Sequence, residues 1–202
     1  MLTFDHIVIG AETLEDGVAY VRERLGVEIP FGGKHPLMGT HNHVMQLGDQ
    51  AFLEVIAIDP EAATARDRWF WLDRFEGPPR IWHWVARVDR MEEAKRLSVD
   101  VGRALDLTRG ELFWQLTVRD DGTMPFDGAH PSIIEWPDGV FPVPNMANLG
   151  CTLKRFSITH PQGDTLKAAL APHLDDPRIK IATGSAVAMT AEIMTPTGLR
   201  SL

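Results

Sequence analysis

The sequence contains a single cysteine, Cys151, and no long run of apolar residues. One cysteine cannot form a disulfide within the chain, which favours a reducing compartment such as the cytoplasm. No apolar segment reaches the roughly 18 residues that a membrane-spanning helix needs. The opening stretch MLTFDHIVIG has neither a basic region nor a small-residue cleavage site, so no secretory signal is predicted. We therefore expect a soluble, cytoplasmic protein that does not act at membranes.

Basic residues are also fewer than acidic ones. The chain has 20 Lys and Arg against 28 Asp and Glu, which gives a formal net charge of −8. A nucleic-acid partner requires a basic surface, so none is expected, and a small-molecule substrate is the partner that we predict. The chain is 44% hydrophobic and 24% charged, as in ordinary folded proteins. Its 202 residues suffice for one core, or for one core with an appendage.

Apolar periodicity divides the first part of the chain into a strand, a helix and further strands. In this first unit (about residues 2–58) we expect strand Leu2–Gly10, helix Leu14–Leu25, loop Gly32–Asn42, and strands His43–Leu47 and Ala51–Ile58. Thr13 can cap the helix and Gly26 can end it. The two later strands are joined at Gly48-Asp49, which is a hairpin signal.

The same order recurs after a polar connector. In the second unit (about residues 81–136) we expect strand Ile81–Val88, helix Met91–Val101, and strands Arg103–Thr108, Glu111–Arg119 and Ser132–Trp136. After a linker, Pro137–Gly150, a shorter unit has strand Thr152–Thr159, helix Asp164–Leu174, and strands Ile179–Thr183 and Ala186–Met194. The prediction is an α+β protein. Paired βαβββ modules form an open barrel-like sheet in residues 1–140, and a C-terminal βαββ unit in residues 150–202 packs on it.

Each of the two long units carries one histidine in its first strand and one glutamate in its last. His6 and Glu54 are 48 residues apart, and His83 and Glu135 are 52 residues apart. If each unit curls so that these faces line a cup, two imidazoles and two carboxylates converge. Such a set suits a divalent ion such as Zn, Ni, Mn, Co or Fe(II), and Glu54 or Glu135 could then move a proton.

A second interpretation applies to each of these residues singly. A histidine in an apolar strand is commonly a hydrogen-bonded core residue, and a glutamate there can be salt-bridged or exposed. Further candidates lie nearby. Arg87 shares the strand face of His83 and would suit a carboxylate or phosphate substrate. His35, Asn42 and Gln115 are predicted to contact substrate, although Gln115 alternates with Trp114, so only one of that pair can face the cup.

Three segments carry a resemblance to a known family. FDHIVIG, WHWVARVDRMEEAKRL and GGKHPLMGTHNHVMQLGDQAFLEVIAID resemble the vicinal oxygen chelate superfamily, and more narrowly its glyoxalase-like domain branch, over about residues 2–140. The resemblance implies paired βαβββ modules around a divalent metal. It also implies ligands at the positions of His6, Glu54, His83 and Glu135. The superfamily includes metal-free binding proteins as well, so the fold does not fix the activity.

Three functions remain open at this point. The first is a metal-dependent isomerase or lyase that acts on a small oxygenated substrate. The second is an Fe(II) extradiol-type dioxygenase, because His6, His83 and Glu135 would form a triad of two histidines and one carboxylate. The third is a metal-free small-molecule binding or resistance protein. The paired modules could belong to one chain or be swapped between two, so a homodimer is also possible.

Overall fold

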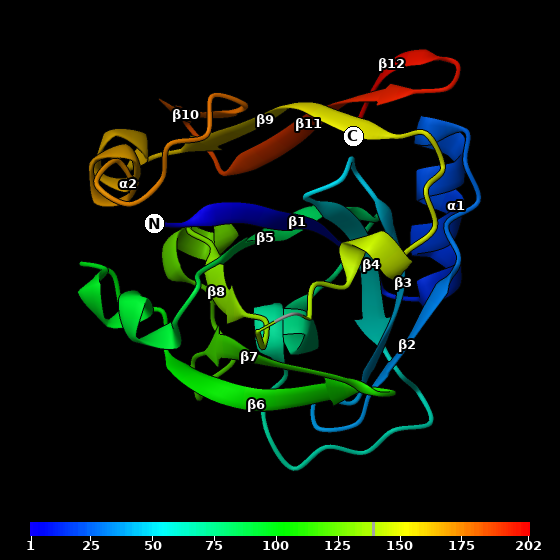
Figure 1. Ribbon diagram of the computed structural model, residues 1–202, viewed down its shortest axis with the longest axis horizontal. Helices are drawn as coiled ribbons and strands as arrows, with labels where there is room; N and C mark the ends of the chain where they lie inside the picture. Colours follow the sequence, from blue (N-terminus) through cyan, green and yellow to red (C-terminus); the bar gives the residue numbers. More distant parts are fainter. Residues whose placement is uncertain (139) are drawn as a thin grey trace.

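A computed structural model describes residues 1–138 and 140–202, whose strands form two β-sheets (Figure 1). Gly139, which belongs to the predicted linker, lies outside the described residues. The larger sheet has eight strands in the order β2-β3-β4-β1-β5-β8-β7-β6, and the smaller has four in the order β10-β9-β11-β12. The strands are β1 (Thr3–Gly10), β2 (Phe31–His35), β3 (Thr40–Gln46), β4 (Phe52–Ile58), β5 (Arg80–Arg87), β6 (Arg103–Arg109), β7 (Leu112–Val118), β8 (Ser132–Glu135), β9 (Thr152–His160), β10 (Ile179–Thr183), β11 (Ala188–Thr195) and β12 (Gly198–Ser201).

Helices are few and short. The α-helices are α1 (Leu14–Leu25) and α2 (Gly163–Leu170), and the 3₁₀ turns are η1 (Trp69–Arg74), η2 (Met91–Arg96), η3 (Pro125–Gly128) and η4 (Val143–Asn145). The predicted ends of α1 are confirmed. The Thr13 side chain accepts a hydrogen bond from the Asp16 amide, and Gly26 ends the helix at φ 71°.

The eight-stranded sheet consists of two modules with the same internal order. In the first module β1 pairs parallel with β4, and in the second β5 pairs parallel with β8. The modules join where β1 pairs antiparallel with β5. The sheet curls into a nearly closed barrel, and its two edge strands β2 and β6 approach each other (Figure 1). The predicted α+β class and the paired modules are confirmed.

Three local predictions differ from the structure. The expected loop at residues 32–42 contains most of β2 and the start of β3. Gly32 and Gly33 do not prevent pairing, and the side chains of Asn42 and Arg109 pack where their Cβ atoms would lie. The expected helix at residues 91–101 is only the short turn η2, and the residues that follow include poor helix formers such as Val99 and Gly102. The C-terminal unit has an additional strand, β12, which makes it βαβββ.

The two central strands, β1 and β5, separate two packed regions. On one side, Phe4 and Trp84 pack against Phe156 of β9, with ring centroids 5.9 and 5.8 Å apart, so the smaller sheet covers this face (Figure 1). On the other side, Val8 and Val85 belong to a separate apolar cluster inside the barrel. The inner face of β1 and β5 is therefore the one that can line a cavity.

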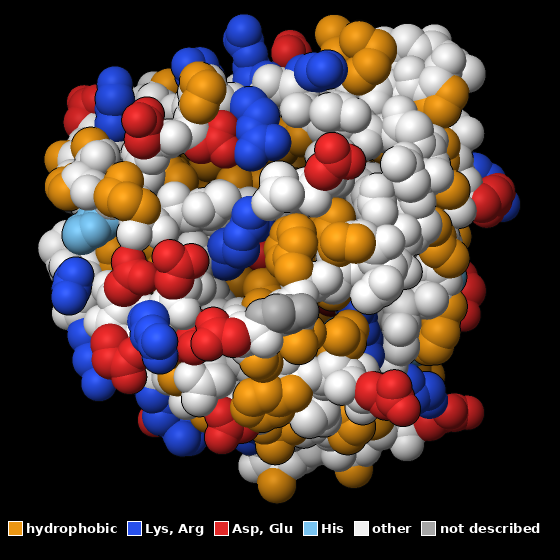
Figure 2. All heavy atoms as spheres, in the orientation of Figure 1, with side chains coloured by type: hydrophobic (Ala, Val, Ile, Leu, Met, Phe, Trp, Pro, Cys, Tyr) orange, Lys and Arg blue, Asp and Glu red, His pale blue; other side chains and the backbone are white. Residues whose placement is uncertain are grey.

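The surface has a mixed character. On the face shown in Figure 2, acidic and basic side chains are interspersed, and hydrophobic side chains gather near the middle. Within residues 1–138 and 140–202, no helix is both long and apolar enough to cross a membrane.

Candidate functional site

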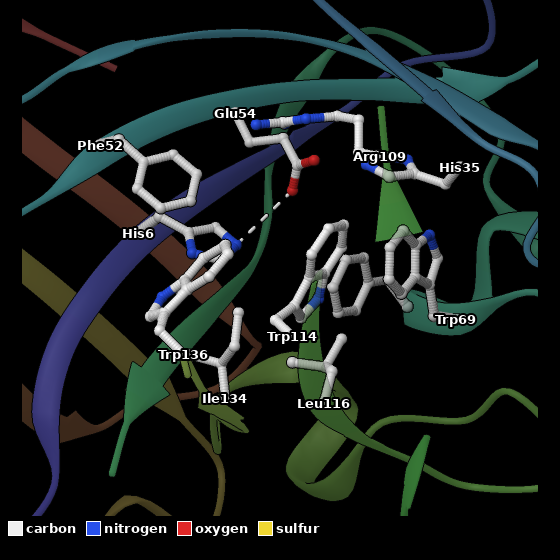
Figure 3. A pocket seen from close by; sticks show the side chains of 11 residues that line it. His6, His35, Phe52, Glu54, Trp69, Arg109, Trp114, Leu116, Ile134 and Trp136 are labelled. Atoms are coloured by element: carbon white, nitrogen blue, oxygen red, sulfur yellow. Dashed lines mark ion pairs between the residues drawn. The ribbon is translucent and has the colours of Figure 1, made fainter. Parts of the chain in front are cut away.

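The barrel encloses a cavity with predominantly aromatic walls (Figure 3). The cavity is narrow. Its volume open to the centre of a water molecule is about 20 Å³, room for about one water, so a larger ligand enters only if the surrounding rings move apart. The lining residues are His6, His35, Phe52, Glu54, Trp69, Phe70, Arg109, Trp114, Leu116, Ile134 and Trp136. These come from β1, β2, β4, η1, β6, β7 and β8, together with the residue after β8, so both modules contribute.

A bulge in β1 places two neighbouring polar side chains together. The pairing of β1 with β5 shifts register between Phe4 and His6, so that Asp5 departs from simple alternation. Its carboxylate Oδ1 lies 2.7 Å from His6 Nδ1, and its Oδ2 accepts a 3.1 Å hydrogen bond from Trp136 Nε1. Asp5 is completely buried. It therefore fixes the imidazole of His6 so that Nε2 faces the cavity.

The other ring nitrogen of His6 faces a second carboxylate. Nε2 of His6 lies 3.6 Å from Oε2 of Glu54, and both side chains are buried. Burial alone would lower the pKa of His6, but hydrogen bonding and charge from Asp5 and Glu54 raise it above its ordinary value. Burial would likewise raise the pKa of Glu54, but His6, His35 and Asn42 lower it to about 2. The arrangement therefore favours the charged pair of an imidazolium and a carboxylate.

A second layer of polar side chains supports Glu54. Asn42 Nδ2 donates a 2.6 Å hydrogen bond to Glu54 Oε1 and lies 3.3 Å from His35 Nε2. His35 Nδ1 lies 3.0 Å from the Thr40 hydroxyl oxygen. Burial lowers the pKa of His35 to about 4, so this ring is neutral at pH 7. The predicted site residues His35 and Asn42 thus lie beside Glu54, His35 at the cavity wall and Asn42 behind it.

Aromatic rings form most of the cavity wall. Phe52 stacks on His6 with centroids 4.1 Å apart, and Trp114 lies 5.4 Å from Trp136. Trp69 and Phe70 come from η1 and stack on each other at 5.1 Å. Phe70 adopts a left-handed φ of 56°, a strained conformation for a non-glycine residue. Such strain is typical of functional sites, where packing holds a side chain in place.

His83 lies inside the barrel but away from the pair of His6 and Glu54. Its Nδ1 is 3.0 Å from the Gly128 carbonyl oxygen, and its Nε2 accepts a 3.2 Å hydrogen bond from the Ser132 amide. Burial lowers its pKa to about 3. In the β1–β5 register His83 is opposite Val8, whereas His6 is opposite Val85. Both nitrogens of His83 are therefore occupied by the protein.

Two further predicted site residues, Glu135 and Gln115, do not face the cavity. Ile134 faces the cavity, so its neighbour Glu135 points to the opposite face of β8, where its carboxylate accepts a hydrogen bond from the Met91 amide. On β7 it is Trp114 that faces inward, and Gln115 donates a 2.8 Å hydrogen bond to Asp106 at the surface. The predicted inward placement of Glu135 and Gln115 is corrected by these contacts.

Arg87 is also engaged outside the cavity. Its guanidinium donates a 2.8 Å hydrogen bond to the Gln50 carbonyl oxygen, lies 3.6 Å from Asp5 Oδ2, and sits 4.6 Å from the ring centroid of Phe141. It does not line the cavity. Instead of contacting a substrate directly, Arg87 balances part of the charge of the buried Asp5.

The donor set does not fit the predicted four-ligand metal site. Only His6 and Glu54 of the four come together. Within the described part of the chain, no three or more His, Cys, Asp or Glu side chains are grouped so that they could hold a metal ion. Protein zinc sites use three or four protein ligands, so two are too few. The expected convergence of four ligands is thus not found.

Sequence reasoning missed several residues of this site, namely Asp5, Trp69, Phe70, Arg109 and Trp136. Arg109 had a usable signal, since it alternates with the buried Leu105 and Leu107 on β6. The apolar run at Trp69-Phe70 within a polar connector was another signal, because a side chain that cannot face water must pack somewhere. The β1 bulge at Asp5 has no comparable trace in the sequence.

Comparisons with known proteins agree on the fold. The sequence model described as glyoxalase-like domain matches residues 4–174. A hypothetical protein from Staphylococcus aureus is 12% identical with a TM-score of 0.63, and the match covers 93% of this chain and 88% of that chain. At that identity the likeness concerns the fold alone. No curated protein matches the sequence significantly.

Two methylmalonyl-CoA epimerases are more distant structural matches. The enzyme from Streptomyces coelicolor, solved with 2-nitronate-propionyl-CoA, is 15% identical with a TM-score of 0.41, covering 68% of this chain and 99% of that chain. The enzyme from Mycobacterium tuberculosis is 15% identical with a TM-score of 0.43, covering 65% of this chain and 86% of that chain.

Proposed function

The chain belongs to the glyoxalase-like domain family of the vicinal oxygen chelate superfamily, and from this premise we propose that it is an isomerase or lyase that moves a proton on a small oxygenated substrate. The observation that supports this function best is the buried ion pair of His6 and Glu54 at the wall of an enclosed cavity. Paired acid and base groups shielded from water are the means by which enzymes transfer protons at carbon.

The two groups would act in sequence on a carbonyl compound. The Glu54 carboxylate takes the proton from the carbon next to the carbonyl, the pair of the broken C–H bond forms a C=C bond, and the π pair of the C=O bond moves to the carbonyl oxygen. The His6 imidazolium donates a hydrogen bond or its proton to that oxygen. In a 2-hydroxy carbonyl compound, the hydroxyl on the deprotonated carbon gives its proton to the neutral imidazole of His6 and becomes the new carbonyl, while Glu54 returns the first proton to the former carbonyl carbon, which completes an isomerisation. In a lyase reaction the carbonyl re-forms instead, and a leaving group on the β carbon departs with its bonding electrons and takes up the proton held by Glu54.

The low pKa of Glu54 in the free protein is compatible with a role as base. It depends largely on His6, which lies 3.6 Å away. When a substrate oxygen accepts the hydrogen bond of His6, the carboxylate loses part of that stabilisation and becomes more basic. Substrate binding would thus raise the pKa of Glu54 and make it a stronger base.

Among the described residues, those at the cavity do not make up a set of three or four metal ligands, so no step is assigned to a metal ion. The dioxygenase alternative needs His6, His83 and Glu135 at one point, and His83 and Glu135 lie elsewhere. A non-catalytic binding protein is the second candidate. The enclosed aromatic wall supports it, since such a wall holds an apolar ligand whether or not chemistry follows.

Exchange of substrate hydrogens with solvent deuterium separates enzyme from binder. Purified protein is mixed in D₂O with a panel of small aldehydes, ketones and 2-oxo acids, and NMR follows deuterium incorporation next to each carbonyl. We expect accelerated exchange in at least one compound, and a loss of about 10²-fold or more in the Glu54→Gln variant. If no member of the panel exchanges faster with the protein than without it, the enzymatic function is contradicted.

A further inference from the structure

Arg109 enters the cavity from the edge strand β6. It is the last residue of that strand and follows Leu105 and Leu107 on the inward face. Figure 3 shows its side chain reaching toward Glu54 along the upper wall, near His35. Its aliphatic stem lies against β2, where a Cβ atom added to Gly33 would be 2.7 Å from the Arg109 Cγ. The glycine therefore makes room for this arginine.

The guanidinium of Arg109 differs from the other partly buried arginines. Arg87 and Arg178 each lie within salt-bridge distance of a carboxylate, at 3.6 and 2.6 Å. Among the described residues Arg109 has neither a hydrogen-bond acceptor nor a salt bridge, and its Nε is fully buried without a partner. Burial lowers its pKa, and the charge of Glu54 offsets this only in part. The half-buried guanidinium thus has one N–H shielded from water with no acceptor, so an anion beside it would be stabilised.

A second donor in the same cavity is also without an acceptor. The indole of Trp69 is only 2% exposed, and its Nε1 has no hydrogen-bond partner in the described part of the chain. Figure 3 shows Trp69 on the side of the cavity where Arg109 and His35 lie. Buried donors in folded proteins almost always have a partner. Two such donors at one cavity indicate a ligand with oxygen acceptors.

We infer that the cavity binds a small carboxylic acid with an aromatic or other flat apolar body, its carboxylate on Arg109 and its body between the aromatic rings. This inference rests on the proposed function and names the substrate class for it. A guanidinium matches the planar carboxylate with two parallel hydrogen bonds. The rings of Trp114, Trp136 and Phe70 supply flat apolar surface for the body.

Charge favours a carboxylate over a phosphate. The imidazolium of His6 and the carboxylate of Glu54 balance each other, which leaves Arg109 as the one net positive charge among the lining residues. A monoanion neutralises it. A phosphate dianion would leave a negative charge in an apolar enclosure next to Glu54, which is unfavourable.

Arg109 also marks where the charged end of the ligand would lie. Besides the cavity it lines a surface groove, together with Phe31, Leu112 and Met146. A ligand that enters from this groove places its apolar body inside and keeps its carboxylate at the arginine. This orientation leaves the carbon next to the carboxyl group toward the pair of His6 and Glu54.

The test compares an acid with its neutral isostere. Binding of 3-phenylpropionate and of 3-phenylpropionamide, neither of which needs to react, is measured by tryptophan fluorescence and calorimetry on the full-length protein. We expect the acid to bind at least tenfold more tightly than the amide. Arg109→Gln should abolish this preference, and Arg109→Lys should retain part of it. Arg103→Gln, on the same strand but exposed and paired with Asp120, is the matched control and should bind like the wild type.

Two further variants keep the outcome decisive. Trp69→Phe retains the wall but removes the indole N–H, and we expect it to weaken the acid more than the amide. Glu54→Gln should bind the acid as well as or better than the wild type, because a competing negative charge is gone. Equal binding of acid and amide to folded wild-type protein, or an unchanged preference in Arg109→Gln, overturns the inference. Acid selectivity without deuterium exchange would contradict only the proposed reaction.

Discussion

The imidazole of His6 is held between two carboxylates, with Asp5 Oδ1 2.7 Å from Nδ1 and Glu54 Oε2 3.6 Å from Nε2. Asp5 has a fixed position because Trp136 and Arg87 bind its other oxygen. The tautomer and orientation of His6 therefore depend on a residue that does not touch the cavity. Asp5 is a positioning residue, and Glu54 is the group that faces the substrate.

Replacing Asp5 by Asn tests this arrangement. Asn at this position keeps the size of the side chain but removes the charge that helps to raise the pKa of His6. We expect the pKa of His6, followed by NMR, to fall toward its ordinary value. Deuterium exchange on a reactive compound should slow roughly 10²-fold, with a rate profile displaced to lower pH. A structural role alone would lower stability and leave the pH profile where it was.

His83 gives a prediction about stability. Burial lowers the pKa of His83 to about 3 and those of His35 and His130 to about 4. Between pH 6.5 and 5 the unfolded chain binds protons that the folded protein does not, so the free energy of unfolding falls as the pH falls. His6, whose pKa is raised, does not make the free energy of unfolding fall in this range. Its stabilising contribution is fully present below pH 6.5 and is lost only at higher pH.

The variant His83→Gln isolates one of these protons. A glutamine side chain can donate to the Gly128 carbonyl oxygen and accept from the Ser132 amide, so the hydrogen bonds of His83 have replacements. Urea unfolding at several pH values between 5 and 6.5 should give a slope smaller by about 1.4 kcal/mol per pH unit than in the wild type. An identical slope would mean that His83 is not buried in its neutral form.

The sequence reveals the repeated modules more readily than the site within them. Strand and helix periodicity locate β1, α1 and β5, because burial on one face leaves a regular trace. Whether Glu135 faces the cavity depends on which residues of β8 point into the barrel. The sequence does not decide this, because Ile133 and Ile134 are both apolar. Either register was compatible with the pattern. Alternation with Leu105 and Leu107 puts Arg109 on the inward face of β6, but its contact with the cavity also requires closure of the barrel edge, which no local pattern encodes.

Metal addition provides another test. Because only His6 and Glu54 meet, we expect Zn²⁺, Ni²⁺ or Mn²⁺ at tenfold molar excess to raise the melting temperature by no more than about 1 °C, since a weakly bound ion adds little free energy. Elemental analysis after desalting should find less than one ion per chain. A stoichiometric ion that is lost in both His83→Gln and Glu135→Gln would contradict this arrangement and restore the four-ligand site.

The close approach of α1 to β4 gives a prediction that can be tested without a ligand. A Cβ atom added to Gly17 would lie 2.4 Å from the Val55 Cγ1, which is too close for the side chain to remain in place. Alanine in a helix is normally favoured over glycine by up to about 1 kcal/mol. Here we expect Gly17→Ala to destabilise the protein by roughly 1 to 3 kcal/mol in urea unfolding, because the strand that carries Glu54 must shift. In the double variant with Val55→Ala the contact with Cγ1 is gone and a 3.0 Å approach to the Ala11 Cβ remains, so adding Gly17→Ala to Val55→Ala should cost clearly less than it does in the wild type. Equal destabilisation in both backgrounds would show that this contact does not set the distance between helix and sheet.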